Sequence, residues 1–145
     1  MRILSLLLLI AASTILTACA RYSVSLNDNE VYAPPSLFTN YAIGDTALAV
    51  CVDYSLREIE ATSSDNLLLL NCSNAGIVTT DGLEIFSRLE QLSLSDNRLT
   101  NIDPLLQLVH LTYLDLRGNE EIDCEVATQL QENIEGTVFV PAHCT

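Results

Sequence analysis

The chain has 145 residues, of which 49% are hydrophobic, and its formal net charge at pH 7 is −13. This length suits one domain of ordinary size. Such a negative charge repels phosphate backbones and anionic lipid headgroups, so it excludes nucleic acid as an expected partner.

The first segment has the layout of an export signal. An apolar run over residues 3–12 follows the single charge of Arg2, and small residues then lead to Cys19. A charged start, a short apolar stretch and a small-residue cleavage zone are typical of a secretory signal peptide. The run ends near Leu16 and is short for a bilayer-spanning helix. We therefore prefer a signal peptide over residues 1–18 to a transmembrane anchor.

The cleavage zone is more specific than the apolar run. The tetrapeptide Leu16-Thr17-Ala18-Cys19 resembles the lipobox of bacterial lipoproteins. The resemblance implies that the signal is cut before Cys19 and that Cys19 carries acyl chains, several of which hold a protein stably on a bilayer. Ala20 stands where an Asp would resemble an inner-membrane retention signal, which implies the outer membrane of the bacterial envelope. The alternative is a plain secreted protein.

Two segments separate the expected anchor from the repeats. Residues 19–44 include two adjacent prolines and show no sustained apolar period, which predicts a flexible tether behind the lipidated Cys19. Such a chain would span roughly 25–30 Å. Asp45 can cap a helix that continues to Tyr54. We expect residues 45–66 to form an N-terminal cap.

Four cysteines remain in the exported part of the chain: Cys51, Cys72, Cys124 and Cys144. An even number in an exported domain indicates disulfides, and four cysteines allow three pairings. We favour Cys51–Cys72 and Cys124–Cys144, because each pair closes a short loop at one end of the domain. A zinc site would need closer cysteine spacings than these.

An internal repeat dominates the rest of the chain. Three segments begin at Leu67, Leu89 and Leu111, at intervals of 22 residues. The same offsets carry apolar residues in each segment, namely Leu70, Leu92 and Leu114, then Cys72, Leu94 and Leu116. Fixed self-similarity at this period is typical of a solenoid of stacked units.

The second segment fits a known pattern. Residues 89–99 match LxxLxLxxNxL at every position, residues 111–119 repeat it, and residues 67–77 are a looser copy. The pattern resembles the leucine-rich-repeat family. The resemblance implies an α/β fold: a short right-handed solenoid with parallel strands on its concave face, repeats over residues 67–122, and helical, disulfide-linked caps. Residues 123–145 would form the C-terminal cap, and Asn97 and Asn119 would hold the turns.

The side chains between the inward leucines should face solvent on the concave face, because successive strand residues point to opposite sides. In the first repeat they are Leu69, Asn71 and Ser73. The partner-binding residues that we predict are Gln91, Ser93, Ser95, Tyr113, Asp115 and Arg117. Tyr and Arg are frequent in binding hot spots, although exposed strand residues need not bind anything.

Little in the sequence indicates catalysis. His110 and His143 accompany no nucleophile elbow and no HExxH pattern. The acidic residues near position 122 do not have EF-hand spacing and suit a solvated helix start. We therefore expect no enzyme activity, no cofactor and no metal.

The combined prediction is a monomeric, membrane-anchored envelope lipoprotein that binds another protein through its repeats. This last step is an analogy, because a fold does not by itself determine a function. The alternative is a structural, matrix or adhesive surface component, which could face glycans and have no discrete protein partner.

Overall fold

The computed structural model describes residues 24–26, 29–32 and 36–145. The chain divides into two compact units, Met1–Ser36 and Leu37–Thr145. In the first unit, β1 (Val24–Leu26) pairs antiparallel with β2 (Asn29–Tyr32). The predicted signal peptide and Cys19 lie outside the described residues. Of the helices that are described, none has the length and apolar character needed to cross a bilayer.

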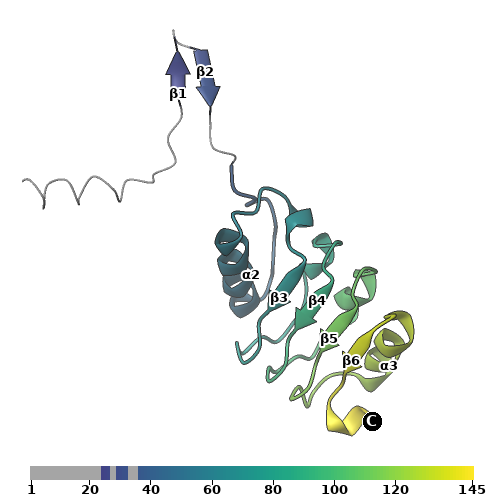
Figure 1. The fold of residues 1–145 in the computed structure, drawn as a ribbon. Coiled ribbons are helices and arrows are strands. Elements are labelled where there is room, and N and C mark those ends of the chain that lie inside the picture. The colour runs from purple at the N-terminus through teal and green to yellow at the C-terminus, as the bar shows by residue number, and fades with distance from the viewer. Residues whose placement is uncertain (1–23, 27–28, 33–35) are drawn as a thin grey trace, which may run out of the picture. The chain divides into compact units, whose positions relative to one another are not determined.

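The second unit is built on a parallel sheet of four short strands (Figure 1). The strands are β3 (Leu69–Asn71), β4 (Gln91–Ser93), β5 (Tyr113–Asp115) and β6 (Thr137–Phe139). They lie side by side in chain order, and each pair is in parallel register. This arrangement confirms the predicted α/β class with a parallel sheet.

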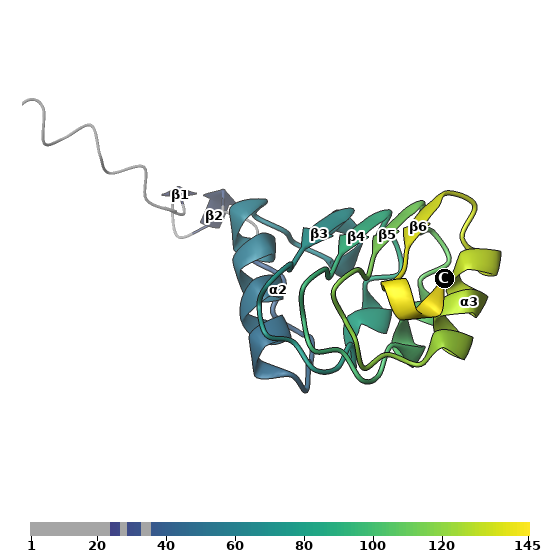
Figure 2. The same ribbon diagram turned by 90° about the horizontal axis from the view of Figure 1, so that it is seen from below.

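Helices lie at the two ends of the sheet and in the segments that connect or flank its strands. Among the described residues, two α-helices, α2 (Thr46–Glu58) and α3 (Cys124–Asn133), lie at opposite ends of the row of strands (Figure 2). The short 3₁₀ helices are η2 (Ser64–Asn66), η3 (Leu83–Ile85), η4 (Asp103–Gln107) and η5 (Ala142–Cys144). Each end of the sheet is thus adjacent to an α-helix.

Leucines that are 22 residues apart in the sequence form rows of buried side chains across adjacent strands. Leu70, Leu92 and Leu114 are register partners in adjacent strands, and all three are buried. Leu94 and Leu116 form a second buried row one step further along. Because no repeat can cover its own apolar face, stacking of these rows supplies the core.

Asn97 connects two neighbouring turns through its buried side chain. Its Oδ1 accepts hydrogen bonds from the backbone N–H groups of Ala75, Gly76 and Ile77, at 2.9–3.1 Å. Its Nδ2 donates to the carbonyl oxygens of Cys72 and Leu94. Asn119 repeats the arrangement one turn later, donating to the carbonyls of Leu94 and Leu116 and accepting from Leu99 N–H.

Ala75 occupies the corresponding position in the first repeat, where the repeat pattern has an asparagine. The asparagine side chain reaches backward to the preceding turn, and the first repeat has α2, not another turn, on that side. The backbone N–H of Ala75 is instead satisfied by Asn97 of the next turn. No substitute for an asparagine is therefore required at this end.

Asp45 caps α2 as predicted and also holds a second segment. Its Oδ1 accepts hydrogen bonds from Ala47 N–H and Leu48 N–H, at 2.8 and 3.0 Å. Its Oδ2 accepts from Val78 N–H at 2.8 Å, which connects the helix start to the first repeat. Burial raises the pKa of Asp45, but these backbone hydrogen bonds outweigh it, so the pKa is lowered overall.

A disulfide holds each terminal helix: one joins α2 to the first repeat, and the other joins α3 to η5 within the C-terminal segment. Cys51 of α2 is bonded to Cys72, with their Cα atoms 5.9 Å apart. Cys124 of α3 is bonded to Cys144 of η5, with a Cα separation of 5.1 Å. These are the pairs that the sequence spacing favoured.

The folded unit begins earlier than the predicted boundary at Asp45. Phe38, Tyr41 and Ile43 lie against the core, although we assigned residues 19–44 to a flexible tether. Phe38 and Tyr41 stack on each other and contact the edge of buried Phe86. These apolar side chains are too widely spaced to give a periodic pattern, which is why the sequence did not predict their packing.

The C-terminal segment forms the strand that the alternation Val138-Phe139-Val140 indicates, but its pairing with the sheet was not predicted. The register pairs Val138 with Leu114 and Phe139 with Asp115, so β6 continues the sheet. The interval from Leu114 to Val138 is longer than 22 residues, and valines replace the leucines. The predicted C-terminal cap therefore also supplies the fourth strand of the sheet.

Polar side chains lie at the starts of the 3₁₀ helices that connect the strands. Pro104 is in the first turn of η4, but the residue before the helix is Ile102 and Asp103 is already inside it. Glu84 accepts from Gly82 N–H, and Asp81 accepts from the side chain of Asn101.

Candidate functional site

The predicted partner-binding residues lie together on the solvent side of the sheet. Strand register places Gln91 beside Tyr113 and Ser93 beside Asp115. Ser95 and Arg117 follow two residues beyond each strand, and the backbone N–H of Asp96 donates to Arg117 O at 2.8 Å. The sequence spacing therefore identified one continuous surface.

The hydroxyls of two of these residues, Ser93 and Ser95, form hydrogen bonds within the chain. The hydroxyl of Ser73 is 2.8 Å from that of Ser93, and Ser95 Oγ donates to Ser73 Oγ at 3.0 Å. Asn71 Oδ1 accepts from both the hydroxyl and the N–H of Ser73. The hydroxyls of Ser73, Ser93 and Ser95 connect neighbouring repeats through hydrogen bonds. We therefore assign these hydroxyls a structural role before any role in binding a partner.

Asp115 was predicted to contact a partner, and its burial contradicts that role. Only 5% of its side chain is exposed, because Arg117 covers it. Asp115 Oδ1 accepts from Arg117 Nε at 2.9 Å, and Oδ2 accepts from Nη2 at 2.5 Å. The carboxylate also accepts from the backbone N–H of Arg117. Asp115 is therefore a positioning residue that fixes Arg117.

The protonation of this pair follows from the same contacts. The hydrogen bonds from the Arg117 side chain lower the pKa of Asp115, and they outweigh the opposite effect of burial. Hydrogen bonding and charge attraction from Asp115 raise the pKa of Arg117. Both groups are thus ionised at neutral pH.

Phe139 of β6 contacts both Arg117 and Tyr113. The sequence analysis did not include it among the predicted binding residues. The Arg117 guanidinium carbon lies 4.4 Å from the centre of the Phe139 ring, a cation–π geometry. Tyr113 meets the same ring edge-on, with ring centres 5.9 Å apart. The alternating Val138-Phe139-Val140 was the available signal, since it places Phe139 on the solvent side of a strand.

A depression of about 280 Å³ lies on the strand face that we predicted to be the concave face. Its lining comes from three adjacent strands and comprises Leu69, Leu70, Asn71, Gln91, Leu92, Ser93 and Tyr113. Leu69 is 59% exposed, although leucine side chains usually avoid water. The depression thus combines an apolar wall with the amide of Gln91.

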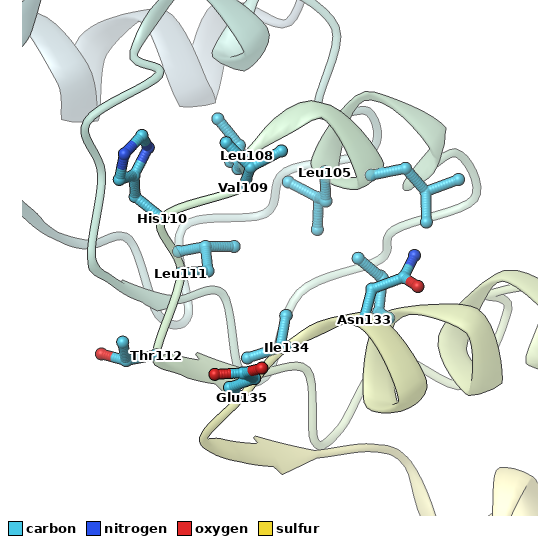
Figure 3. Close-up of a pocket in the computed structure, with 11 residues that line it drawn as sticks. Leu105, Leu108, Val109, His110, Leu111, Thr112, Asn133, Ile134 and Glu135 are labelled. Carbon is cyan, nitrogen blue, oxygen red and sulfur yellow. The ribbon is translucent and has the colours of Figure 1, made fainter.

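A larger pocket of about 600 Å³ lies away from this face, between η4 with its following loop and the end of α3. In Figure 3, leucines of the repeat and Ile134 from the end of α3 lie around the hollow, with Asn133 and Glu135 beside Ile134. His110 is among the lining residues, and its Nδ1 is 2.9 Å from the backbone oxygen of Ser87. The lining is mostly apolar.

Near the C-terminus, the sulfurs of Cys124 and Cys144 lie close to the imidazole of His143. Both sulfurs are used in the disulfide, so this group does not offer thiolate ligands for a metal ion. His143 Nδ1 is instead 3.5 Å from a carboxylate oxygen of Glu120.

Comparisons with known proteins agree with the repeat architecture of the parallel sheet. Residues 87–126 match the family described as "Leucine Rich repeats (2 copies)". A stretch of 77 residues, 53% of the chain, is 35% identical to the leucine-rich repeat-containing protein 56 of mouse, and equally to that of rat. The match spans 14% of each relative's length. Residues 87–126 are thus similar to leucine-rich repeats, and the parallel sheet with two α-helices in the described residues is consistent with a short solenoid of that kind.

Proposed function

We propose that the unit Leu37–Thr145 is a protein-binding module that acts through its concave face. The observation that carries this proposal is the Arg117 cluster, defined as Tyr113, Asp115, Arg117 and Phe139. An arginine that is 57% exposed is fixed there by a covered carboxylate and an aromatic ring. Rigid arginine and aromatic side chains bind partners at low entropic cost. Repeats of this family commonly bind proteins, which supports the proposal by analogy.

The test is a comparison of partners captured from cells that produce the full chain. We expect the double variant Tyr113→Ala, Arg117→Ala to lose the proteins captured by the unsubstituted chain. The matched control is Arg88→Ala with Val109→Ala, because both residues are exposed and neither belongs to the concave face. Capture of the same proteins at the same strength by the double variant would contradict the proposal.

We also propose that the module is held at a bacterial envelope by a lipid on Cys19, with the outer membrane as its destination. The support is the apolar run of residues 3–12 followed by the tetrapeptide ending at Cys19. The two disulfides of the folded unit agree with an oxidising compartment outside the cytosol. We propose that the unit is monomeric, because α2 and α3 cover the two ends of its sheet.

The anchor has its own test in a Gram-negative host. We expect Cys19→Ser to leave the precursor uncleaved or to release the protein from the outer-membrane fraction, because the acyl chains attach at this thiol. Ser13→Ala, inside the same predicted signal, serves as the control and should be processed normally. Unchanged cleavage and membrane attachment of Cys19→Ser would contradict the lipoprotein proposal.

A further inference from the structure

Arg117 keeps hydrogen-bond donors available for a ligand. A guanidinium has five N–H donors in a fixed plane. Asp115 accepts from Nε and Nη2, and among the described residues no other side chain accepts from this group. Both hydrogens on Nη1 and the second hydrogen on Nη2 therefore remain. They lie at the end of the guanidinium, where a second planar acceptor can bind in a bidentate manner.

Arg117 presents a positive side chain on this face, although the whole chain is strongly acidic and the charge of Asp96 also acts on the guanidinium. The solvent-facing strand residues other than Asp115 are uncharged: Leu69, Asn71, Gln91, Ser93, Tyr113, Thr137 and Phe139. Asp115 is covered by Arg117, so a ligand reaches the guanidinium and not the carboxylate.

The depression supplies a second point of contact on the same face. Tyr113 belongs both to the lining of the depression and to the Arg117 cluster, so the two features are continuous. The exposed Leu69 forms part of its lining. Burial of an apolar side chain there would remove Leu69 from water, which is favourable in proportion to the area covered.

We propose that the partner of the concave face is a protein segment that presents an Asp or Glu side chain to Arg117 and an apolar side chain to the depression. This inference rests on the proposed function, because it names the chemistry of the partner at the same site. Charge complementarity carries it: the carboxylate meets the exposed positive group. The segment as a whole should be neutral or basic apart from this carboxylate, because the acidic chain repels polyanions at longer range.

The experiment uses the full chain and a phage-displayed library of random peptides as the probe. The strongest binders are synthesised with each Asp or Glu kept or changed to Asn or Gln. Affinities are measured by calorimetry for the unsubstituted chain, for Arg117→Met, and for Arg88→Met as the matched control. Far-ultraviolet circular dichroism and thermal unfolding establish that each variant is folded.

We expect one acidic residue of the peptide to contribute to the affinity for the unsubstituted chain but not to the affinity for Arg117→Met. Its change to the amide should weaken binding by about tenfold or more on the unsubstituted chain and on Arg88→Met. On Arg117→Met the acidic and amide peptides should bind equally. Leu69→Ala should weaken both peptides by a similar factor, because it removes the apolar contact.

The outcomes separate this inference from the proposed function. Peptides that lose affinity on Tyr113→Ala but bind equally with carboxylate or amide would overturn the inference and leave the binding face in place. Equal effects of the acidic residue on the unsubstituted chain and on Arg117→Met would also overturn it. Failure to select any peptide sensitive to Tyr113→Ala would contradict both the inference and the proposed function.

Discussion

The side chain of Asn97 shows how one residue holds two repeats together. It accepts from three consecutive backbone N–H groups of the preceding turn and donates to carbonyl groups of both turns. Only an amide offers an acceptor and two donors at this size. The resemblance to leucine-rich repeats implied this role for Asn97 and Asn119, and it satisfies the hydrogen bonds that a buried amide requires.

Removing the amide of Asn97 should destabilise the fold strongly. Asn97→Ala leaves several buried backbone groups without partners, and we expect the free energy of unfolding to fall by about 3 kcal/mol. Urea unfolding followed by circular dichroism measures this change. Asn133→Ala is the control, because Asn133 is exposed at the end of α3 and should matter little. Equal stability of the two variants would show that the side-chain hydrogen bonds of Asn97 are not required for the stability of the fold.

Asp115 should make stability depend on acid pH. Its pKa is lowered in the folded state, chiefly by the Arg117 side chain, so the unfolded chain binds the proton more readily. The stabilisation is complete above the unfolded pKa of about 4 and is lost as the pH falls through the lower folded pKa. Asp115→Asn should therefore show a flatter loss of stability between about pH 5 and pH 2 than the unsubstituted chain.

Urea midpoints measured across this pH range check the expectation. Glu132→Gln, an exposed position in α3, serves as the control and should retain the acid dependence of the unsubstituted chain. A variant Asp115→Asn with the same pH profile as the unsubstituted chain would show that the ion pair contributes nothing to folding.

At the scale of elements, predictability depended on how regular each element is. The strands β3, β4 and β5 follow the 22-residue interval, so their faces and their register could be predicted. The strand β6 breaks the interval and uses valines, and with it the contact between Phe139 and Arg117 was missed. The packing of Phe38 and Tyr41 was missed because it depends on tertiary contacts with Phe86, which no local pattern reports.

The entry into β6 depends on Gly136. A Cβ atom at this position would meet the backbone carbonyl of Thr112, which accepts the hydrogen bond from Thr137 N–H that begins the pairing of β5 with β6. We expect Gly136→Ala to lower the free energy of unfolding by about 2 kcal/mol, because a backbone carbonyl cannot move aside without shifting the strand.

Gly44→Ala is the matched control for Gly136→Ala. A Cβ atom there has no neighbour within 4 Å, so we expect a change within about 0.5 kcal/mol. Thermal or urea unfolding compares the two variants directly. If Gly136→Ala were as stable as Gly44→Ala, the close approach of the chain to Thr112 would not be a constraint on the fold.

At the scale of the whole molecule, the unit Leu37–Thr145 is a short stack with a helix at each end. Its core is the interior of the repeats, and the Cys51–Cys72 and Cys124–Cys144 disulfides hold the terminal helices. Each disulfide closes a loop of about 20 residues, which by chain entropy alone contributes roughly 3 kcal/mol. A stack this short gains from such links, because few repeats bury limited apolar area.

The binding surface follows from this architecture only in part. The repeat pattern indicated which residues face solvent on the strands, since alternate side chains point outward. It could not show that Asp115 is covered, because that depends on the conformation of Arg117. The long side chain and its ring contact decide which predicted residues a partner can reach.

Site-specific photocrosslinking in living cells tests the central claim, that the concave face binds the partner. A photoreactive residue replaces either Gln91, exposed on β4, or Gln107, exposed at the end of η4. The account predicts a discrete adduct from position 91, none from position 107, and loss of the adduct when Tyr113→Ala and Arg117→Ala are added. Adducts from position 107 alone, equal adducts from both positions, or no adduct from position 91 would contradict it.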